Sequence, residues 1–162
     1  MSHYPRSTAR ALDVIGESWT PLIVRDISMG LRRFDQIHGN LGIPRKALTE
    51  RLDRLVQGGV LERSEHGSRP GRHEYVLTEQ GRELVPVVLG LMAWGDRWKT
   101  EDEGPSLRTR HTPCGQLIVP VQSCPNCKEA VTADNTRSEA APGARPEPGT
   151  REKSLMYGFS AI

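Results

Sequence analysis

The stretch that decides the fold is PRKALTERLDRLVQ, residues 44–57. At about 100° per residue, Leu48, Leu52 and Leu55 fall on one side of a helix, and polar or charged side chains fall roughly opposite. Pro44 suits the first residue of such a helix, because its φ is already fixed near the helical value. The pattern predicts an amphipathic helix that buries one face in a core and leaves the other face exposed for binding.

Two earlier segments and a turn lead into this helix. Residues 34–41 predict a short helix, and Gly42 after it can take the positive φ that a tight turn requires. Farther upstream, residues 8–15 carry apolar side chains at helical spacing. A further helix is expected up to Gly30, with Thr20 as its N-cap and a proline at its first position.

A hairpin follows the helix at 44–57. Residues 60–63 and 73–77 read as strands, and the loop 66–71 between them contains the glycines and the proline that favour chain reversal. Helix, helix, hairpin is the order of a winged helix-turn-helix. Such a unit places its second helix in the DNA major groove and its hairpin tip near the neighbouring phosphates.

Basic and small polar side chains surround this predicted reading unit. An arginine can bridge the acceptors of guanine, a threonine can touch a thymine methyl group, and phosphate contacts add salt-dependent affinity. The alternative is a merely solvated helix face, which Glu50 and Asp53 favour because carboxylates repel phosphate. The candidate DNA-contacting residues are Arg32, Arg33, Arg45, Lys46, Thr49, Arg54, Arg69 and Arg72.

Total charge says little about a partner, but its distribution says more. The formal net charge is +2 and the sequence pI is about 8.6. Residues 1–76 hold 12 Lys or Arg against 9 Asp or Glu, and the remainder holds 10 against 11. The excess positive charge therefore lies with the predicted reading unit. An apolar content of 36% can build one compact core but hardly two.

A long helix is expected from Thr78, its N-cap, to about Trp98. Pro86 should kink this helix rather than end it, because the apolar face continues beyond it. The stripe is too long for a small domain to cover, so we expect burial against a second copy, the alternative being packing on its own domain. Its members are Leu84, Val87, Val88, Leu91, Trp94 and Trp98.

Composition divides the remaining chain. Residues 101–110 are polar and predict a linker, 111–131 form a small element that bears every cysteine, and 132–162 should be largely disordered. No apolar run approaches the roughly 20 residues that span a bilayer, and three cysteines cannot all pair within one chain. We expect a soluble cytoplasmic protein, mainly α with a small β-hairpin.

The cysteine element contains two potential chelating pairs, His111 with Cys114 and Cys124 with Cys127. Joined by the strand-like stretch 117–121, they could supply a tetrahedral His-Cys₃ site for structural zinc. The alternative is a small hairpin with reduced thiols, since Lys128 stands where zinc knuckles often use glycine. The sequence leaves both interpretations open.

A set of residues spread over about residues 6–100 forms a pattern more specific than any single motif. The residues are 11–16, Trp19, Arg25, Gly30, 32–34, 41–43, Leu48, Arg51, Leu52, Leu55, 59–63, Pro70, 72–75, Leu77, Thr78, Gly81, Trp94 and Gly95. In this pattern the chain resembles the HxlR family of winged helix-turn-helix regulators. The resemblance implies a homodimeric transcription factor that binds double-stranded DNA at an inverted-repeat operator and dimerises through its N-terminal and long C-terminal helices.

Some regulators that resemble this one sense oxidants or electrophiles through a cysteine just before the first helix. Arg6 stands at the corresponding position here, so we do not expect that thiol chemistry. If a small-molecule effector binds instead, we expect it in a crevice near Trp19, Trp94 and Trp98, although such aromatic residues are more often plain core. No catalytic motif is present, so an enzyme is not expected. The alternative function is a winged-helix module that binds a protein and carries a structural zinc element.

Overall fold

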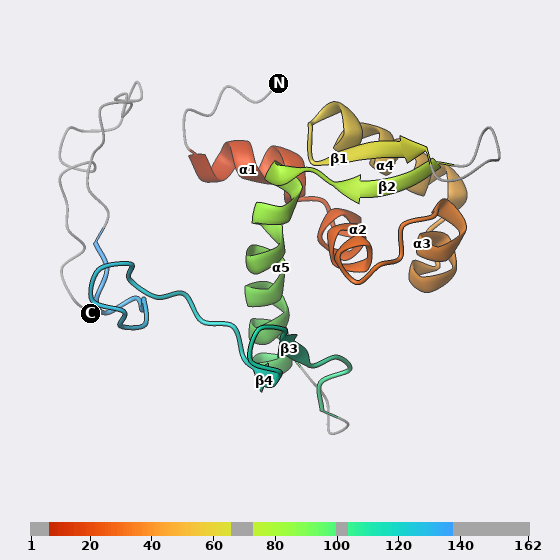
Figure 1. The fold of residues 1–162 in the computed structure, drawn as a ribbon. Helices are drawn as coiled ribbons and strands as arrows, with labels where there is room; N and C mark the ends of the chain where they lie inside the picture. Colours follow the sequence, from red (N-terminus) through yellow and green to blue (C-terminus); the bar gives the residue numbers. More distant parts are fainter. Residues whose placement is uncertain (1–6, 66–72, 100–103, 138–162) are drawn as a thin grey trace, which may run out of the picture.

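The computed structural model describes residues 7–65, 73–99 and 104–137. They form the predicted winged helix-turn-helix fold, mainly α with small hairpins (Figure 1). The long helix α5 leaves the part formed by α2, α3, α4, β1 and β2, which we call the head, and β3 and β4 lie at its far end. In chain order the elements are α1 (Ser7–Ile15), α2 (Trp19–Ser28), α3 (Phe34–Leu41), α4 (Arg45–Gln57), β1 (Leu61–Glu65), β2 (His73–Leu77), α5 (Glu79–Trp98), β3 (Thr109–His111) and β4 (Gln116–Ile118).

The core of the head is built on the apolar stripe of α4. Leu48, Leu52 and Leu55 are all buried, as the sequence pattern predicts. They join a cluster with Ile23 and Ile27 of α2 and further apolar side chains from α3, the turn after it and the wing. Because this stripe is inside, the opposite side of α4 is turned outward.

The turn between α3 and α4 has the expected geometry. Gly42 has φ +63°, and its N–H donates to the carbonyl of His38 at 3.0 Å. Pro44 precedes the helix as its N-cap residue, one position earlier than expected, with extended ψ of 135°. Its carbonyl already accepts from the Leu48 N–H at 3.0 Å, so the helix is hydrogen-bonded from Pro44 onward.

The start of α2 differs from the prediction. Thr20 is buried inside the helix rather than at its N-cap, so that assignment is wrong. The N-cap residue is Ser18, whose side chain makes no capping hydrogen bond, and the carboxylate of Glu17 accepts from the Trp19 N–H at 3.2 Å instead. A carboxylate beside the free N–H groups of a first helical turn also interacts favourably with the helix dipole.

The wing is an antiparallel pair that runs from Leu61 opposite Leu77 to Glu65 opposite His73. Strand β1 therefore reaches two residues farther toward the tip than expected. The segment just before α3 lies beside this pair, because the Tyr75 N–H donates to the carbonyl of Arg32 at 2.8 Å. The predicted tip residues Arg69 and Arg72 lie outside the described residues.

Helix α5 begins as predicted and continues through Pro86 to Trp98. The Thr78 hydroxyl accepts from the Gly81 N–H at 3.1 Å and donates to the carbonyl of Gly59 at 2.6 Å, so this cap also fixes the helix to the end of α4. The expected apolar stripe divides in two. Leu84 and Val88 pack in the core, whereas the exposed part, which we call the α5 stripe, comprises Val87, Leu91, Trp94 and Trp98, each 48–61% exposed.

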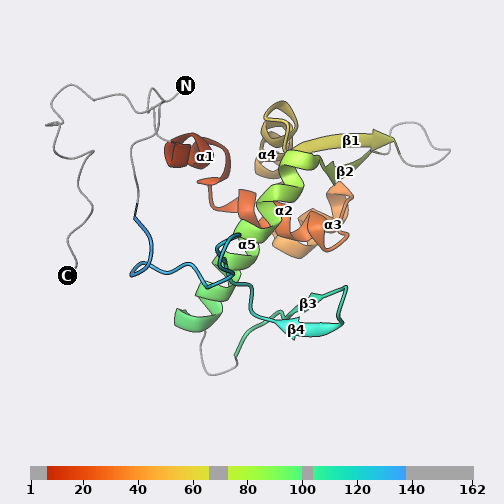
Figure 2. The same ribbon diagram turned by 60° about the vertical axis from the view of Figure 1, so that its left-hand side comes forward.

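The segment after α5 is more ordered near its start than predicted. Strand β3 begins inside the expected linker 101–110, because Thr109 and Arg110 pair with Ile118 and Leu117 of β4. Figure 2 shows this hairpin from a second side, again beside the far half of α5. Most of the expected disordered tail, residues 138–162, lies outside the described residues. Within the described ranges, every helix is too short or too polar to cross a membrane.

Two glycines of α5 offer a test of this packing. A Cβ at Gly81 would lie 2.2 Å from the carbonyl oxygen of Val60, whereas one at Gly90 would meet nothing within 4 Å. Gly81→Ala should therefore lower the free energy of unfolding by about 1–3 kcal/mol through overpacking. Gly90→Ala should raise it by about 0.5–1 kcal/mol, because alanine loses less backbone entropy in a helix. Chemical denaturation followed by circular dichroism checks both, and equal effects of the two variants would contradict this account of the α5 contact.

Candidate nucleic-acid interface

The outward side of α4 carries the side chains that the sequence assigned to DNA contact. Arg45, Lys46, Thr49 and Arg54 are all exposed. The guanidinium of Arg45 lies 3.3 Å from the Asp35 carboxylate and 4.8 Å from the centre of the Phe34 ring. These contacts hold Arg45 at the start of α4, the part of a recognition helix that reaches base edges.

Each acidic residue of α4 lies close to a basic side chain. Glu50 lies 4.0 Å from the Lys46 ammonium one turn earlier, a separation that gives only a weak interaction. Asp53 forms an ion pair with Arg63 of strand β1, whose guanidinium also lies 6.0 Å from the centre of the Tyr75 ring. The pairing of Asp53 removes much of the expected repulsion between this side of the helix and phosphate.

Other arginines border the α4 surface. Arg32 and Arg33 are exposed, and the main chain at Arg33 forms a bridge to Glu74 of β2. The Arg33 N–H donates to the side-chain oxygen of Gln36 at 3.0 Å, which fixes the entry into α3. The structure therefore brings Arg32 and Arg33 between α3 and the wing, where a helix-turn-helix approaches the phosphate backbone.

Sequence reasoning missed a buried carboxylate with its hydrogen bonds and one ion pair, which together hold the helices of the head in place. Buried Asp26 accepts from the Arg25 guanidinium at 2.7 Å and from the Asn40 amide at 2.8 Å, which joins α2 to α3. The Arg51 guanidinium lies 2.6 Å from the Glu17 carboxylate, which joins α4 to the start of α2. One feature of the sequence could have indicated the role of Asp26. It interrupts the apolar stripe of α2, and a carboxylate buried there requires partners.

The His and Cys residues form two similar turns. In the first, the Gly115 N–H donates to the carbonyl of His111 at 2.8 Å, and Gly115 has φ +70°. In the second, the Lys128 N–H donates to the carbonyl of Cys124 at 2.9 Å, and Lys128 has φ +64° although it is not a glycine. Each turn thus places a left-handed residue directly after its last cysteine.

The side chains within each turn are close together, but the turns themselves are apart. His111 Nδ1 lies 3.2 Å from Cys114 Sγ. The N–H groups of Cys127 and Asn126 and the Cys127 side chain lower the pKa of the Cys124 thiol, because hydrogen bonds stabilise its thiolate. Within the ranges that the structure describes, no group of three His, Cys, Asp or Glu side chains could hold a metal ion. The four expected ligands are therefore present as two pairs.

The three tryptophans near which an effector crevice was expected have different surroundings. Trp19 packs against the core, whereas Trp94 and Trp98 are exposed on the α5 stripe. An effector site beside them stays a prediction. Spacing alone could not distinguish the side of α5 that faces the head from the side that faces away.

The geometry defines a class: a winged helix-turn-helix with an exposed, partly basic recognition helix. Residues 14–103 match the HxlR-like helix-turn-helix family, and the chain belongs to this family of transcriptional regulators. An uncharacterized HTH-type transcriptional regulator of Mycobacterium tuberculosis is 46% identical over 137 residues, 85% of this chain and 87% of its own. YvaP of Bacillus subtilis, also described as an uncharacterized HTH-type transcriptional regulator, is 33% identical over 90 residues, 55% of this chain and 83% of its own.

Solved structures show the same architecture. The crystal structure of PA1607, described as a candidate transcription factor, has a TM-score of 0.75 and 33% identity, covering 86% of this chain and 97% of PA1607. The reduced form of the redox regulator HypR has a TM-score of 0.53 and 32% identity, covering 57% of this chain and 92% of HypR. The match to PA1607 therefore takes in more of this chain than residues 14–103, the span of the family match.

The Asp53–Arg63 pair supplies a test of the electrostatics. Arg63→Ala should weaken binding to a duplex by roughly fivefold, about 1 kcal/mol, because the freed Asp53 carboxylate then faces phosphate. The double variant Asp53→Asn with Arg63→Ala should recover most of this loss. Fluorescence anisotropy at fixed salt measures both. No recovery in the double variant would mean that Arg63 acts by another route.

Proposed function

We propose that the protein regulates transcription as a homodimer that binds an inverted-repeat operator through α4 and the wing. The observation that carries this proposal is the outward side of α4, where exposed basic and small polar side chains stand over a fully buried leucine stripe. Arg45 and Thr49 have the chemistry for base edges, whereas Arg54, Arg32 and Arg33 have the chemistry for phosphates. Family membership supports DNA as the partner.

The dimer is supported by the α5 stripe. Val87, Leu91, Trp94 and Trp98 recur every three or four residues and are about half exposed, which is unusual for a contiguous apolar surface on a monomer. Leu12 of α1 is also 55% exposed, and no residue of α1 is buried. A second copy would cover these surfaces and set the separation of the two recognition helices, which fixes the half-site spacing.

The DNA surface is tested by comparing a phosphate contact with a base contact. Arg54→Ala should weaken binding to every sequence to a similar extent and reduce the slope of log affinity against log salt by about 1. Thr49→Ala should instead alter the preferred base at one position in operator selection. Arg137→Ala, which removes an exposed arginine outside α4 and the wing, is the control for total charge. If the wild-type protein fails to bind any duplex at about 50 mM salt, a protein partner for α4 becomes the better interpretation.

The dimer surface is tested by adding one charge to the α5 stripe. Leu91→Glu should shift the protein from dimer to monomer, because the carboxylate would have to be buried without a partner. Val121→Glu adds the same charge to an apolar residue that is 76% exposed and lies outside α5. Sedimentation velocity measures the oligomeric state of both. A monomeric wild type, or loss of the dimer in both variants, would contradict the assignment of the α5 stripe.

We also propose structural zinc at His111, Cys114, Cys124 and Cys127, a site that requires the two turns, which lie apart in this structure, to come together around the ion. The two turns support it, because both present a chelating pair on the same backbone geometry, with a left-handed residue after the last cysteine. One nitrogen and three sulfur ligands are a donor set that zinc binds readily. Zinc would connect the second turn to the β3–β4 hairpin, a role in stability rather than catalysis because four protein ligands leave no open position.

Elemental analysis of protein purified without added metal tests this site. We expect about one zinc per chain in the wild type and a loss of most of it in Cys124→Ser. Ser123→Ala, which alters the neighbouring residue and no ligand, should keep the metal. Less than about a tenth of an equivalent in the wild type would remove the zinc proposal and leave the turns as hydrogen-bonded structure.

A further inference from the structure

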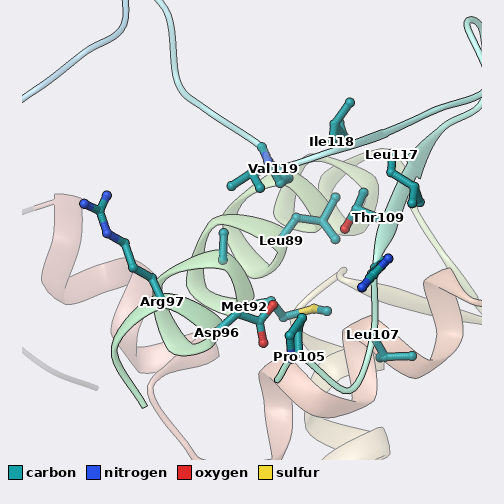
Figure 3. Close-up of a pocket in the computed structure, with 13 residues that line it drawn as sticks. Leu89, Met92, Asp96, Arg97, Pro105, Leu107, Thr109, Leu117, Ile118 and Val119 are labelled. Atoms are coloured by element: carbon teal, nitrogen blue, oxygen red, sulfur yellow. The ribbon is translucent and has the colours of Figure 1, made fainter. Parts of the chain in front are cut away.

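A cavity of about 620 Å³ lies between the second half of α5 and the β3–β4 hairpin (Figure 3). Its first wall is helical and includes Leu89, Met92 and Ala93. Its second wall comes from β4 and the residues after it, with Leu117 to Pro120, and residues from the connection before β3 also line it. A volume in this range suits a small organic ligand rather than a few waters.

The lining is mainly apolar with a few charged groups. Asp96 and Arg108 line the cavity, and neither forms an ion pair with another described residue. Arg97 is also at its border, but its side chain extends away from the other labelled residues in Figure 3 and lies over the Trp98 ring at 5.0 Å. One carboxylate and one guanidinium nearly cancel, which favours a ligand without net charge and with a few hydrogen-bonding groups.

The cavity faces away from the proposed dimer surface. At 100° per residue, the mean direction of Leu89, Met92, Ala93 and Asp96 is about 180° around α5 from that of the α5 stripe. A second copy that covers the α5 stripe therefore leaves this side of the helix uncovered. This argues for a small molecule rather than the partner subunit as the occupant.

The second wall is an addition to the family's shared domain. The family match ends at residue 103, and the cavity's remaining lining residues lie at 105–120. The match to the Mycobacterium tuberculosis relative is 137 residues long. At most 103 of them can lie at or before residue 103, so at least 34, the difference between 137 and 103, lie beyond the family match. YvaP, with 90 matched residues over most of its own length, matches about as much as the shared domain alone. The residues of the second wall thus lie in a segment that the Mycobacterium tuberculosis relative also matches and that lies beyond the family match.

The cavity is also in contact with the core of the head. Met92 lines the cavity and packs against the buried cluster that includes Val88. A group that fills the cavity would therefore press on the same helix that is capped onto the end of α4 through Thr78 and Gly59.

We propose that this cavity, lined by α5 and the β3–β4 hairpin, binds a mainly apolar organic molecule without net charge, the effector of the regulator. The role as an effector site rests on the proposed function, but binding itself does not. The ligand would place its apolar body between Leu89, Met92 and Leu117 and direct its polar groups toward Asp96 and Thr109.

Titration of the full-length protein with the uncharged dye Nile red, in the absence of DNA, tests the site. We expect saturable binding of one dye per chain. Ala93→Trp fills the cavity from the α5 wall and should weaken dye binding at least tenfold, whereas Glu83→Trp, on the same helix but outside the lining, should bind like the wild type. Circular dichroism confirms that both variants are folded.

A second pair of variants leaves α5 unchanged. Leu117→Asp places a charge in the cavity from the exposed hairpin and should also weaken binding, whereas Val121→Asp, another exposed apolar position outside the lining, should not. Dye binding that survives both Ala93→Trp and Leu117→Asp would overturn the proposal, because the dye would then occupy another surface such as the α5 stripe. Failure of the wild type to bind duplex DNA counts only against the proposed function, since these titrations contain no DNA.

Discussion

Burial of Leu48, Leu52 and Leu55 is the constraint on which the rest of the structure depends. Once these side chains are inside the head, the rotation of α4 about its own axis is fixed. Helical geometry then turns Arg45, Thr49 and Arg54 outward. Each buried leucine contributes about 2 kcal/mol of hydrophobic free energy, so exposing all three by rotating this helix half a turn would cost about 6 kcal/mol, comparable with the whole stability margin of a small domain. The presentation of the polar side is thus a consequence of core packing.

Ion pairs and hydrogen bonds then add to the positioning of the helices that apolar packing imposes. Asp26 is buried and would be costly alone, but Arg25 and Asn40 satisfy it and fix α3 against α2. Arg63 reaches from the wing to Asp53, so the wing both borders the α4 surface and lowers its negative charge. The head therefore holds its recognition helix by apolar contacts from beneath and by ion pairs from the sides.

The sequence predicted the elements that depend on local signals. Helix α3, the Gly42 turn and the Thr78 cap were predicted because each rests on residues a few positions apart. The errors occurred where distant residues decide. Thr20 has the chemistry of an N-cap, but Ser18 occupies that position. The Glu17 carboxylate accepts from the first N–H of the helix and also pairs with Arg51, 34 positions away. For the same reason the Asp53–Arg63 pair could not be predicted. Periodicity alone also did not show which part of the α5 stripe packs on the head and which part is exposed.

The candidate sites divide in the same way. The α4 side chains could be assigned from one helix alone, whereas the cavity beside α5 depends on how the β3–β4 hairpin returns to that helix. The left-handed geometry of Lys128 shows that a non-glycine residue can complete the second cysteine turn, which spacing rules based on glycine would disfavour. Residues that act within one element are predictable from sequence, and those that act between elements require the fold.

Site-specific photo-crosslinking to a duplex tests the central claim most directly. A photoreactive side chain at Thr49, on the outward side of α4, should form a covalent adduct with bound DNA, whereas the same side chain at Val121 should not. A protein–DNA complex that forms normally but gives no adduct from position 49, or equal adducts from both positions, would contradict the conclusion that α4 presents this surface to the double helix.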